Sequence, residues 1–490
     1  MTAPDSRERR PVIAIMLPMV WSVRNVIHAG VLQRLADDGA EVHLLFRRQP
    51  AGNADLPKTV LAVAAGVHPL LAVQGRPGHG KSLTDGLLKS AFCQHHASAS
   101  YRIYQRWFAS QQGAVGRTRG ALIDAAGSVL GTGRAFRRLA RLPERMYRSS
   151  HQLGPVRAQL GQIAPDLLWS TVSVAAAEYP YALVAQELGL TTISSILSFD
   201  NLTSRGLLPS YGQYLVWSEG MRADLLRMYP MVSPERVEVT GTPQFDFHRR
   251  PEAHWPRVRT LEALGLPADS RYLAYAASHS SLTPGEPRLV AQLAARLAAS
   301  PGFSAHRLVV RMHPLDDWSR WEPVRQLRSV VLSPAWDVPP DPEGWAFGSV
   351  ADQERLVSTF AHADVCLNIA STATLDAAIL GRPVVGIDFR AEPDCPRDIL
   401  YEEYDADHYR PLVEMGGLRI AHGWGELEAL LAGALREPGA DAAQRRAMVE
   451  RECGAVDGHA ADRVADAVLR AARGGAARWR PALTREVAVA

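Results

Sequence analysis

Short apolar runs alternate with longer segments of helical spacing along the first half of the chain. Residues 12–17 and 41–46 are apolar runs of strand length, and residues 25–38 between them carry apolar side chains every three or four positions. A strand, a helix and a second strand joined by short connections form a βαβ unit with parallel strands. Further strands are predicted at 166–170, 192–196, 214–218 and 237–240, with helices at 175–188 and 219–229.

The alternation lapses after Pro243 and then begins again. Residues 247–267 are polar and rich in proline, which is typical of a linker between domains. The second alternation predicts strands at 272–277, 307–312, 364–369 and 383–388, and helices at 287–299, 353–361, 374–380, 425–435 and 461–472. A chain of 490 residues is also too long for one ordinary core.

These patterns predict an α/β protein with two doubly wound, Rossmann-like domains that face a central cleft. We place the first domain at 1–245 and the second at 246–490, with a closing helix and a loose tail at the end of the second. In such folds, ligands bind beyond the carboxyl ends of the parallel strands.

Residues 85–165 do not fit the alternation and are predicted to form a helical, arginine-rich insertion in the first domain. Within it, residues 134–148 place apolar side chains near one helix face and four arginines around them. A solvated helix packed on its own domain explains this pattern. A surface that contacts a membrane or an anionic acceptor explains it as well.

Composition excludes several classes of protein. Hydrophobic content of 47% and charged content of 21% are typical of a globular protein, and a net charge of +3 is too small for a dedicated nucleic-acid binder. The four cysteines have no metal-ligand spacing, which favours a reducing compartment. Pro18 interrupts the first apolar run, so we expect no signal peptide and a cytoplasmic location.

GRPGHGKS at 75–82 matches the phosphate-binding P-loop of nucleotide hydrolases letter for letter. A P-loop, however, normally follows the first strand of its domain and needs a second strand that ends in a magnesium-binding aspartate. The sequence already completes a βαβ unit before residue 75, and no nearby strand supplies that aspartate. We therefore favour a glycine-rich loop at the edge of the cleft, where Lys81 could contact an anionic acceptor.

Several segments resemble the GT-B glycosyltransferase superfamily, in particular bacterial members related to UDP-glycosyltransferases, glycogen phosphorylase and CDP-glycerol glycerophosphotransferases. The strongest is DVCLNIASTATLDAAILGRPVVGIDFR at 364–390. VRMHP at 310–314, the segments 198–206 and 215–246, and VDGHAADRVADAV at 456–468 add to the resemblance. The resemblance implies transfer of a sugar from a nucleotide-activated donor to a hydroxyl acceptor, with no metal and no cofactor.

The strongest segment predicts a phosphate site. Ser371, Thr372 and Thr374 stand where a helix begins after a buried strand, so backbone N–H groups and hydroxyls would meet a diphosphate there. Capping of the helix alone would explain the same residues. The resemblance implies that Asp376 binds the ribose of the donor.

His313 and Pro314 end another predicted strand and resemble the His-Pro motif of glycerophosphotransferases and sialyltransferases, in which the histidine meets the nucleotide phosphate. Arg311 lies two residues before. Ser278, Ser280 and Ser281 follow the first strand of the second domain, and they either bind the phosphates as well or form a hydrophilic turn.

Transfer with inversion requires a base from the acceptor domain. Asp200 follows a strand on the correct edge and is our first candidate, with His28 second; Arg24 and Asn25 are predicted to contact the acceptor. Asp37-Asp38-Gly39 matches an acidic motif of sialyltransferase-like relatives, but its position predicts a helix terminus instead.

Three other functions remain open. One is transfer of an alditol phosphate or of a sugar from a CMP donor, and another is isomerisation by a UDP-N-acetylglucosamine 2-epimerase, whose D-S-G-G signature is replaced here by A-S-T-A. A P-loop hydrolase is the third. YDADH at 404–408 contains the D-x-D that binds a metal in the other glycosyltransferase fold, but it lies late in the nucleotide domain, and we predict no essential metal.

Overall fold

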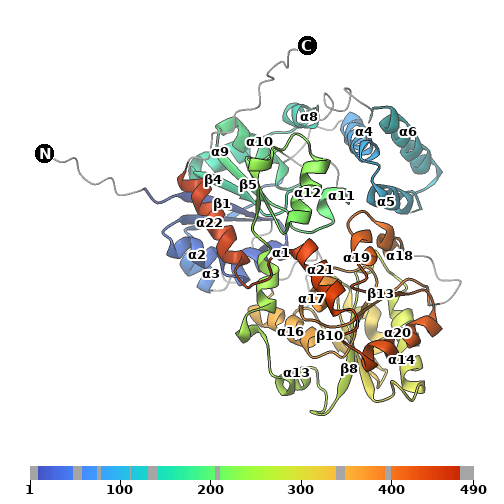
Figure 1. The fold of residues 1–490 in the computed structure, drawn as a ribbon. Coiled ribbons are helices and arrows are strands. Elements are labelled where there is room, and N and C mark those ends of the chain that lie inside the picture. The colour runs from blue at the N-terminus through green and yellow to red at the C-terminus, as the bar shows by residue number, and fades with distance from the viewer. Residues whose placement is uncertain are drawn as a thin grey trace.

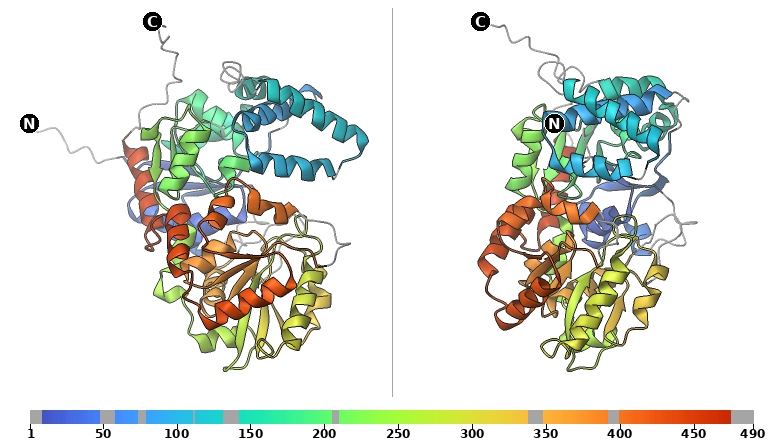
Figure 2. Two further views of the ribbon diagram at one scale, coloured as in Figure 1. Left: turned by 45° about the vertical axis from the view of Figure 1, so that its right-hand side comes forward. Right: turned by 90° about the vertical axis from the view of Figure 1, so that its right-hand side faces the viewer.

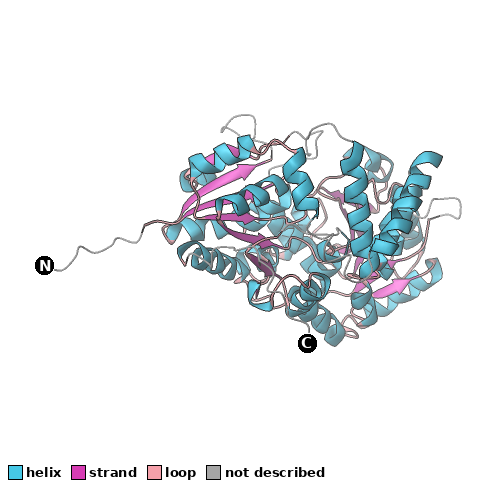
Figure 3. Ribbon diagram, turned by 90° about the horizontal axis from the view of Figure 1, so that it is seen from above, coloured by secondary structure: helices cyan, strands magenta, loops and turns pink. Residues whose placement is uncertain are grey.

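The structure is a computed structural model, and it describes residues 9–47, 58–73, 79–110, 112–130, 142–204, 210–337, 348–391 and 399–474. Two parallel sheets form the centres of two lobes (Figure 1). Helices cover the faces of both sheets (Figure 3), as expected when parallel strands are joined by crossover helices. The predicted pair of doubly wound domains is confirmed.

The first sheet has seven strands in the order β3-β2-β1-β4-β5-β6-β7, all parallel. Its strands are β1 (Val12–Leu17), β2 (Glu41–Phe46), β3 (Gly66–Pro69), β4 (Leu167–Ser170), β5 (Thr191–Ser195), β6 (Gln213–Val216) and β7 (Val237–Val239). The order reverses between β1 and β4, which is the point where doubly wound sheets open a crevice for ligands.

The second sheet has six parallel strands in the order β10-β9-β8-β11-β12-β13. They are β8 (Arg271–Ala276), β9 (His306–Arg311), β10 (Val330–Ser333), β11 (Cys366–Asn368), β12 (Val384–Ile387) and β13 (Arg419–Ala421). The sequence pattern missed the short strands β3, β10 and β13. Outer strands of a sheet need less continuous apolar sequence than central ones, so their signal is weaker.

The helices that flank these sheets include α10 (Tyr179–Leu188), α12 (Glu219–Met228), α14 (Glu286–Ala299), α16 (Val350–Ala361), α17 (Ala373–Ile379) and α20 (Trp424–Arg436). The single helix predicted over 25–38 is wrong in detail. A π-helical turn, η1 (Arg24–His28), comes first, and α2 (Val31–Asp37) begins after Gly30, whose φ of 92° breaks the helix. Asp37 is the last residue of α2, so the acidic motif there does mark a helix terminus, as predicted.

The last helix, α22 (Ala460–Arg473), does not pack on the second sheet, although it follows that domain in sequence. Val464 and Val468 lie in the same buried cluster as Ile13 of the first sheet. Asp246 accepts hydrogen bonds from the amides of Ala460 and Ala461 at 3.0 and 2.8 Å and thereby caps the helix. The closing helix therefore belongs to the first lobe (Figure 1).

The insertion is helical, as predicted, and consists of α4 (His79–His95), α5 (Ala99–Ser110), α6 (Ala114–Leu130), α8 (Leu142–Ser150) and α9 (Gly154–Ile163). Helices α4, α5 and α6 project beside the first lobe, and α5 lies next to the second (Figures 1 and 2). The carboxylate of Asp407 accepts hydrogen bonds from the Ser98 hydroxyl at 2.9 Å and the Ser100 amide at 3.1 Å. The insertion therefore bridges the two lobes. No helix in the described ranges is long and apolar enough to cross a bilayer.

Candidate active site

A cavity of about 450 Å³ lies between the two lobes. Every strand that contributes to it does so through the loop at its carboxyl end, as the doubly wound topology requires. From the first lobe, residues of the loops after β1, β4, β5, β6 and β7 line it: Met19, Trp21, Arg24, Val172, Val174, Ala175, Leu197, Ser198, Asp200, Asn201, Trp217 and Gln244. The second lobe contributes the loops after β8, β9, β10 and β11 together with α16 and α17.

We call the second lobe's side of this cavity the carboxyl-terminal wall and the first lobe's side the amino-terminal wall. The polar residues of the carboxyl-terminal wall are Arg311, His313, Gln353, Ser371, Thr372 and Asp376. Five of these six were predicted from the sequence as donor-binding residues. Their roles stay predictions, but the structure brings all five to one cavity.

The loop between β11 and α17 supplies two hydroxyls. The Thr372 side chain is exposed and that of Ser371 is half-buried. Asn368, at the end of β11, accepts a hydrogen bond from the Ser371 amide at 3.3 Å, and Ala370 has a φ of 33°, in the left-handed region that a non-glycine residue seldom adopts. The local backbone is therefore held in a strained conformation at the cavity wall, which is where functional sites often store strain.

Thr374 has a different position from its two neighbours. It is fully buried, and its hydroxyl bonds the side chains of Asn368 at 3.0 Å and Tyr409 at 2.7 Å. Thr374 does not line the cavity. We therefore reassign it from donor contact to support of the loop that carries Ser371.

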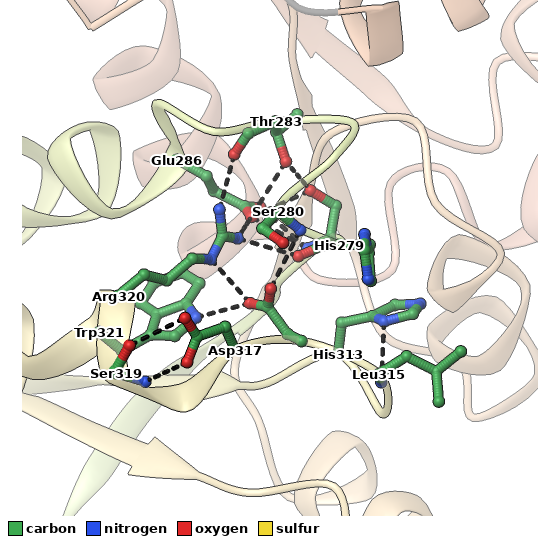
Figure 4. A network of polar contacts seen from close by, with 12 residues as sticks. His279, Ser280, Thr283, Glu286, His313, Leu315, Asp317, Ser319, Arg320 and Trp321 are labelled. Atoms are coloured by element: carbon green, nitrogen blue, oxygen red, sulfur yellow. Dashed lines mark hydrogen bonds and ion pairs between the residues drawn. The ribbon is translucent and has the colours of Figure 1, made fainter. Parts of the chain in front are cut away.

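His313 faces the cavity directly after β9. Its Nδ1 accepts a hydrogen bond from the Leu315 amide at 3.2 Å, so the ring proton is on Nε2 when the ring is neutral (Figure 4). Burial lowers the pKa of His313 to about 4. At neutral pH the side chain is therefore an uncharged donor, and within the described part of the chain Nε2 has no hydrogen-bond partner.

Arg311 is buried beneath this wall. Its guanidinium donates to the carbonyls of Pro334 at 2.7 Å, Ala335 at 3.1 Å and Asp352 at 3.3 Å, while Nε is buried without a partner. Burial lowers its pKa to about 9, which still leaves the side chain charged at neutral pH. Arg311 thus ties the loop after β10 to α16 and adds positive charge to the wall.

Asp376 points into the cavity from α17, and a buried histidine lies behind it. Nε2 of the buried His248 lies 3.0 Å from its Oδ1. Its side chain keeps 18% of its surface exposed. His248 therefore lies against one carboxylate oxygen without hydrogen-bond geometry, and the Asp376 side chain lines the cavity.

The three predicted serines after β8 lie outside the cavity lining. Ser278 is buried, and its amide and hydroxyl bond Glu286 at 3.1 and 3.0 Å. The Ser280 amide bonds Asp316 at 3.0 Å, and the Ser281 hydroxyl bonds His279 at 2.7 Å. These contacts assign the serines to the support of a turn, so we correct their expected role as phosphate ligands.

This turn belongs to a polar network that lies under His313 (Figure 4). Arg320 bonds Glu286 at 2.9 Å and Asp316 at 2.8 Å, and Trp321 also donates to Asp316, at 2.7 Å. Burial raises the pKa of Glu286 to about 7, against the opposing effect of Arg320. The network fixes the loop after β8 against the loop that carries His313, and no sequence pattern predicted it.

The amino-terminal wall contains Asp200 and Arg24, as predicted. Asp200 follows β5, and its Oδ1 accepts from the Asn201 side chain at 3.2 Å. Arg24 donates to Asn25 at 3.1 Å and to Gln244, and burial lowers its pKa to about 10, so it stays charged. Both side chains face the same cavity as His313.

The other two residues predicted for this wall do not reach the cavity. Asn25 lines a separate space of about 20 Å³ and accepts from Arg24, so it orients that arginine. His28 ends η1 outside the cavity lining, and burial lowers its pKa to about 4. We therefore keep Asp200 as the candidate base and no longer assign that role to His28.

Trp21, Gln244, Gln353 and Trp336 line the cavity but were not predicted. Trp21 lies three residues from Arg24 in the same connection, so that proximity was a usable signal. The sequence did not single out Gln244, because this residue lies at the cavity only where the chain crosses from the first lobe to the second.

The remaining motifs lie elsewhere. Of GRPGHGKS, residues 75–78 lie outside the described residues and residues 79–82 begin α4, after the edge strand β3. In YDADH, the carboxylate of Asp407 accepts hydrogen bonds from residues at the start of α5. Most of 134–148 also lies outside the described residues, but Arg148 bonds Gln186 at 2.8 Å and so packs on its own domain.

No protein-family model and no curated protein matches this sequence. Solved structures do match. One is S. aureus MnaA with UDP, at 10% identity and a TM-score of 0.50 over 94% of this chain and 96% of that one. Another, from Listeria monocytogenes, is described as a UDP-N-acetylglucosamine 2-epimerase and matches at 12% identity and a TM-score of 0.51, over the same shares.

A third match is the glycosyltransferase of kitacinnamycin, at 14% identity and a TM-score of 0.50 over 94% of this chain and 99% of that one. The matches extend over nearly the whole length of each chain. Together with the two facing parallel sheets they show that the chain has the GT-B fold.

Proposed function

We propose that the protein is a glycosyltransferase that moves a sugar from a nucleotide-activated donor to a hydroxyl acceptor, without a bound metal. The observation that carries the proposal is the interlobe cavity itself. One wall presents uncharged donors and a buried arginine to an anion, and the opposite wall presents a carboxylate. This division suits a reaction in which a phosphate leaves on one side and a proton is removed on the other.

On the carboxyl-terminal wall, the Nε2–H group of His313 and the hydroxyls of Ser371 and Thr372 would bind the phosphates of the donor. Arg311 would stabilise their charge from beneath. Asp376, which lines the cavity beside His248, would accept hydrogen bonds from hydroxyls of the nucleoside. These roles leave the donor's sugar turned toward the amino-terminal wall.

On the amino-terminal wall, Asp200 would take the proton of the acceptor hydroxyl. The acceptor oxygen then bonds the anomeric carbon, and the bond from that carbon to the phosphate breaks, with its electron pair leaving on the nucleotide. Arg24 would hold the acceptor beside the sugar. Trp21 offers an aromatic face, on which the apolar side of a sugar ring can pack.

Binding experiments test the donor half of this proposal. Thermal shifts and calorimetry with UDP, CDP, CMP, dTDP and GDP should reveal one preferred nucleotide, bound equally well in EDTA. Ser371→Ala should weaken its binding about tenfold, as expected for the loss of one hydrogen bond to a charged group. Ser281→Ala is the matched control, because this serine lies outside the cavity. Equal effects of the two changes would contradict the proposed site.

Epimerisation of a UDP-sugar is the second candidate. One of the matched structures is described as a UDP-N-acetylglucosamine 2-epimerase, and another holds UDP. The two reactions differ in what they need. An epimerase changes its substrate without an acceptor, whereas a transferase releases free nucleotide only when an acceptor, or water in its place, takes the sugar. Proton NMR of UDP-N-acetylglucosamine incubated with the protein alone distinguishes a new epimer from an unchanged substrate.

A further inference from the structure

The outer face of α6 is apolar and strongly exposed, which is unusual among the described residues. Val115, Leu122 and Val129 expose 86%, 67% and 71% of their surfaces. They are spaced seven residues apart, so they lie on one face of the helix, two turns from each other. Among the described residues only four other large apolar side chains are exposed, and these lie in four separate places: Leu188, Met231, Val258 and Val350.

The orientation of α6 is fixed by its inner face. A Cβ at Gly127 would lie 2.2 Å from the Ser90 hydroxyl of α4, so the two helices are in close contact there. Asp124, the one acidic residue of α6, accepts from Ser90 at 2.9 Å and from the Tyr101 hydroxyl at 3.0 Å. These contacts hold the apolar side chains on the opposite, outward face.

Charge on this part of the chain is strongly positive. Residues 85–165 contain twelve Lys and Arg against three Asp and Glu, a net charge of +9 in a chain whose total is +3. Arg117 and Arg119 lie on α6 itself and are exposed, and the only acid of the helix is turned inward. Arg119 lies beside the apolar face, and an apolar helix face with an adjacent arginine, within a cationic segment, matches the surface of an anionic bilayer.

We propose that the face of α6 formed by Val115, Leu122 and Val129 docks on an anionic lipid bilayer, with the helix lying in the plane of the interface. The apolar side chains enter the boundary between headgroups and acyl chains, while Arg119 meets the lipid phosphates. This surface is distinct from the one predicted at 134–148. It lies outside the interlobe cavity, and the proposal does not depend on the reaction that occurs there.

Co-sedimentation of the full chain with vesicles tests the proposal. Vesicles of phosphatidylcholine with one quarter phosphatidylglycerol should bind the protein at low salt, and pure phosphatidylcholine vesicles should bind it at least tenfold more weakly. Binding to the anionic vesicles should also fall at 0.5 M salt, because salt screens exposed charges. Equal binding to both kinds of vesicle, or to neither, would overturn the proposal.

Variants then locate the surface. The triple change Val115→Ser, Leu122→Ser and Val129→Ser should lower partitioning to anionic vesicles at least tenfold, because three apolar side chains no longer enter the interface. The matched control is Leu188→Ser, Val258→Ser and Val350→Ser, which alters three exposed apolar residues elsewhere and should leave partitioning unchanged. Thermal melting checks that both triple variants are folded.

A second copy of the chain is the rival occupant of this face. Light scattering coupled to size exclusion distinguishes it. A wild-type dimer that the α6 triple variant converts to a monomer would overturn the proposal, because the apolar face would then be buried between protomers. A wild-type monomer that binds anionic vesicles through α6 supports it.

Discussion

The two walls of the interlobe cavity are built in different ways. In the carboxyl-terminal wall, His313 and Ser371 come from short segments that follow strands, and each is held by a residue close to it in sequence: the Leu315 amide donates to His313, and the Ser371 amide donates to Asn368. The amino-terminal wall brings Arg24 together with Gln244, which is 220 residues away. One wall is encoded locally, whereas the other depends on the assembly of the whole lobe.

The largest effect is expected from Arg311→Met. This change removes a buried cation and leaves the carbonyls of Pro334, Ala335 and Asp352 without their donor, which should lower the free energy of unfolding by roughly 3 kcal/mol. Urea denaturation measures it. Arg307→Met, on the exposed side of the same strand, is the control and should cost far less. Equal losses in the two variants would show that the carboxyl-terminal wall does not depend on Arg311.

Asp200→Asn tests whether the two walls have different functions. If Asp200 is the base, turnover should fall about 100-fold, while the dissociation constant of the donor nucleotide stays unchanged, because the donor lies on the other wall. Steady-state kinetics with calorimetry checks both quantities. Full activity in this variant would show that Asp200 is not the base.

Thr372 and Thr374 allow a comparison between an exposed hydroxyl in the cavity wall and a buried hydroxyl two residues away. Thr372→Val should weaken donor binding about tenfold and leave stability unchanged, since the exposed hydroxyl makes no internal bond. Thr374→Val should instead lower the free energy of unfolding by about 1–2 kcal/mol, because Asn368 and Tyr409 lose a buried partner. Calorimetry and urea denaturation of the two variants distinguish these outcomes. A reversed pattern would contradict the division of roles.

A pH dependence tests His313 itself. The pKa of His313 is about 4 in the folded chain and about 6.5 when unfolded, so the unfolded state binds the proton between these values. Stability should therefore fall as the pH drops from 6.5 to 4, by at most about 1.4 kcal/mol per pH unit for this residue. His313→Gln should flatten the slope of unfolding free energy against pH. His459→Gln, at an exposed position, should not.

The same contrast explains what the sequence could predict. The positions of the β11 segment and of the His-Pro pair could be predicted, because a buried strand, a short loop and a helix follow one another directly in the chain. The three serines after β8 share that setting, yet the structure uses them in a turn. Ser278 bonds Glu286, on another element, and Arg320, which is distant in sequence. Ser280 bonds Asp316, and Ser281 bonds His279. Which side of a loop faces the cavity is decided by such distant partners. For that reason the pattern did not distinguish Thr374, whose hydroxyl is bonded inside the lobe, from Ser371 and Thr372, and it did not single out Gln244 or Trp336.

The bond between Asp407 and α5 has a consequence for motion. The lobes are joined on one side by the crossing at Pro243 and the returning helix α22, and on the other by the hydrogen bonds from Ser98 and Ser100. A hinge at the first connection cannot swing open while the second one holds. Any opening of this cleft must therefore either break that contact or carry α5 along with the moving lobe, which would tilt the helices of the insertion.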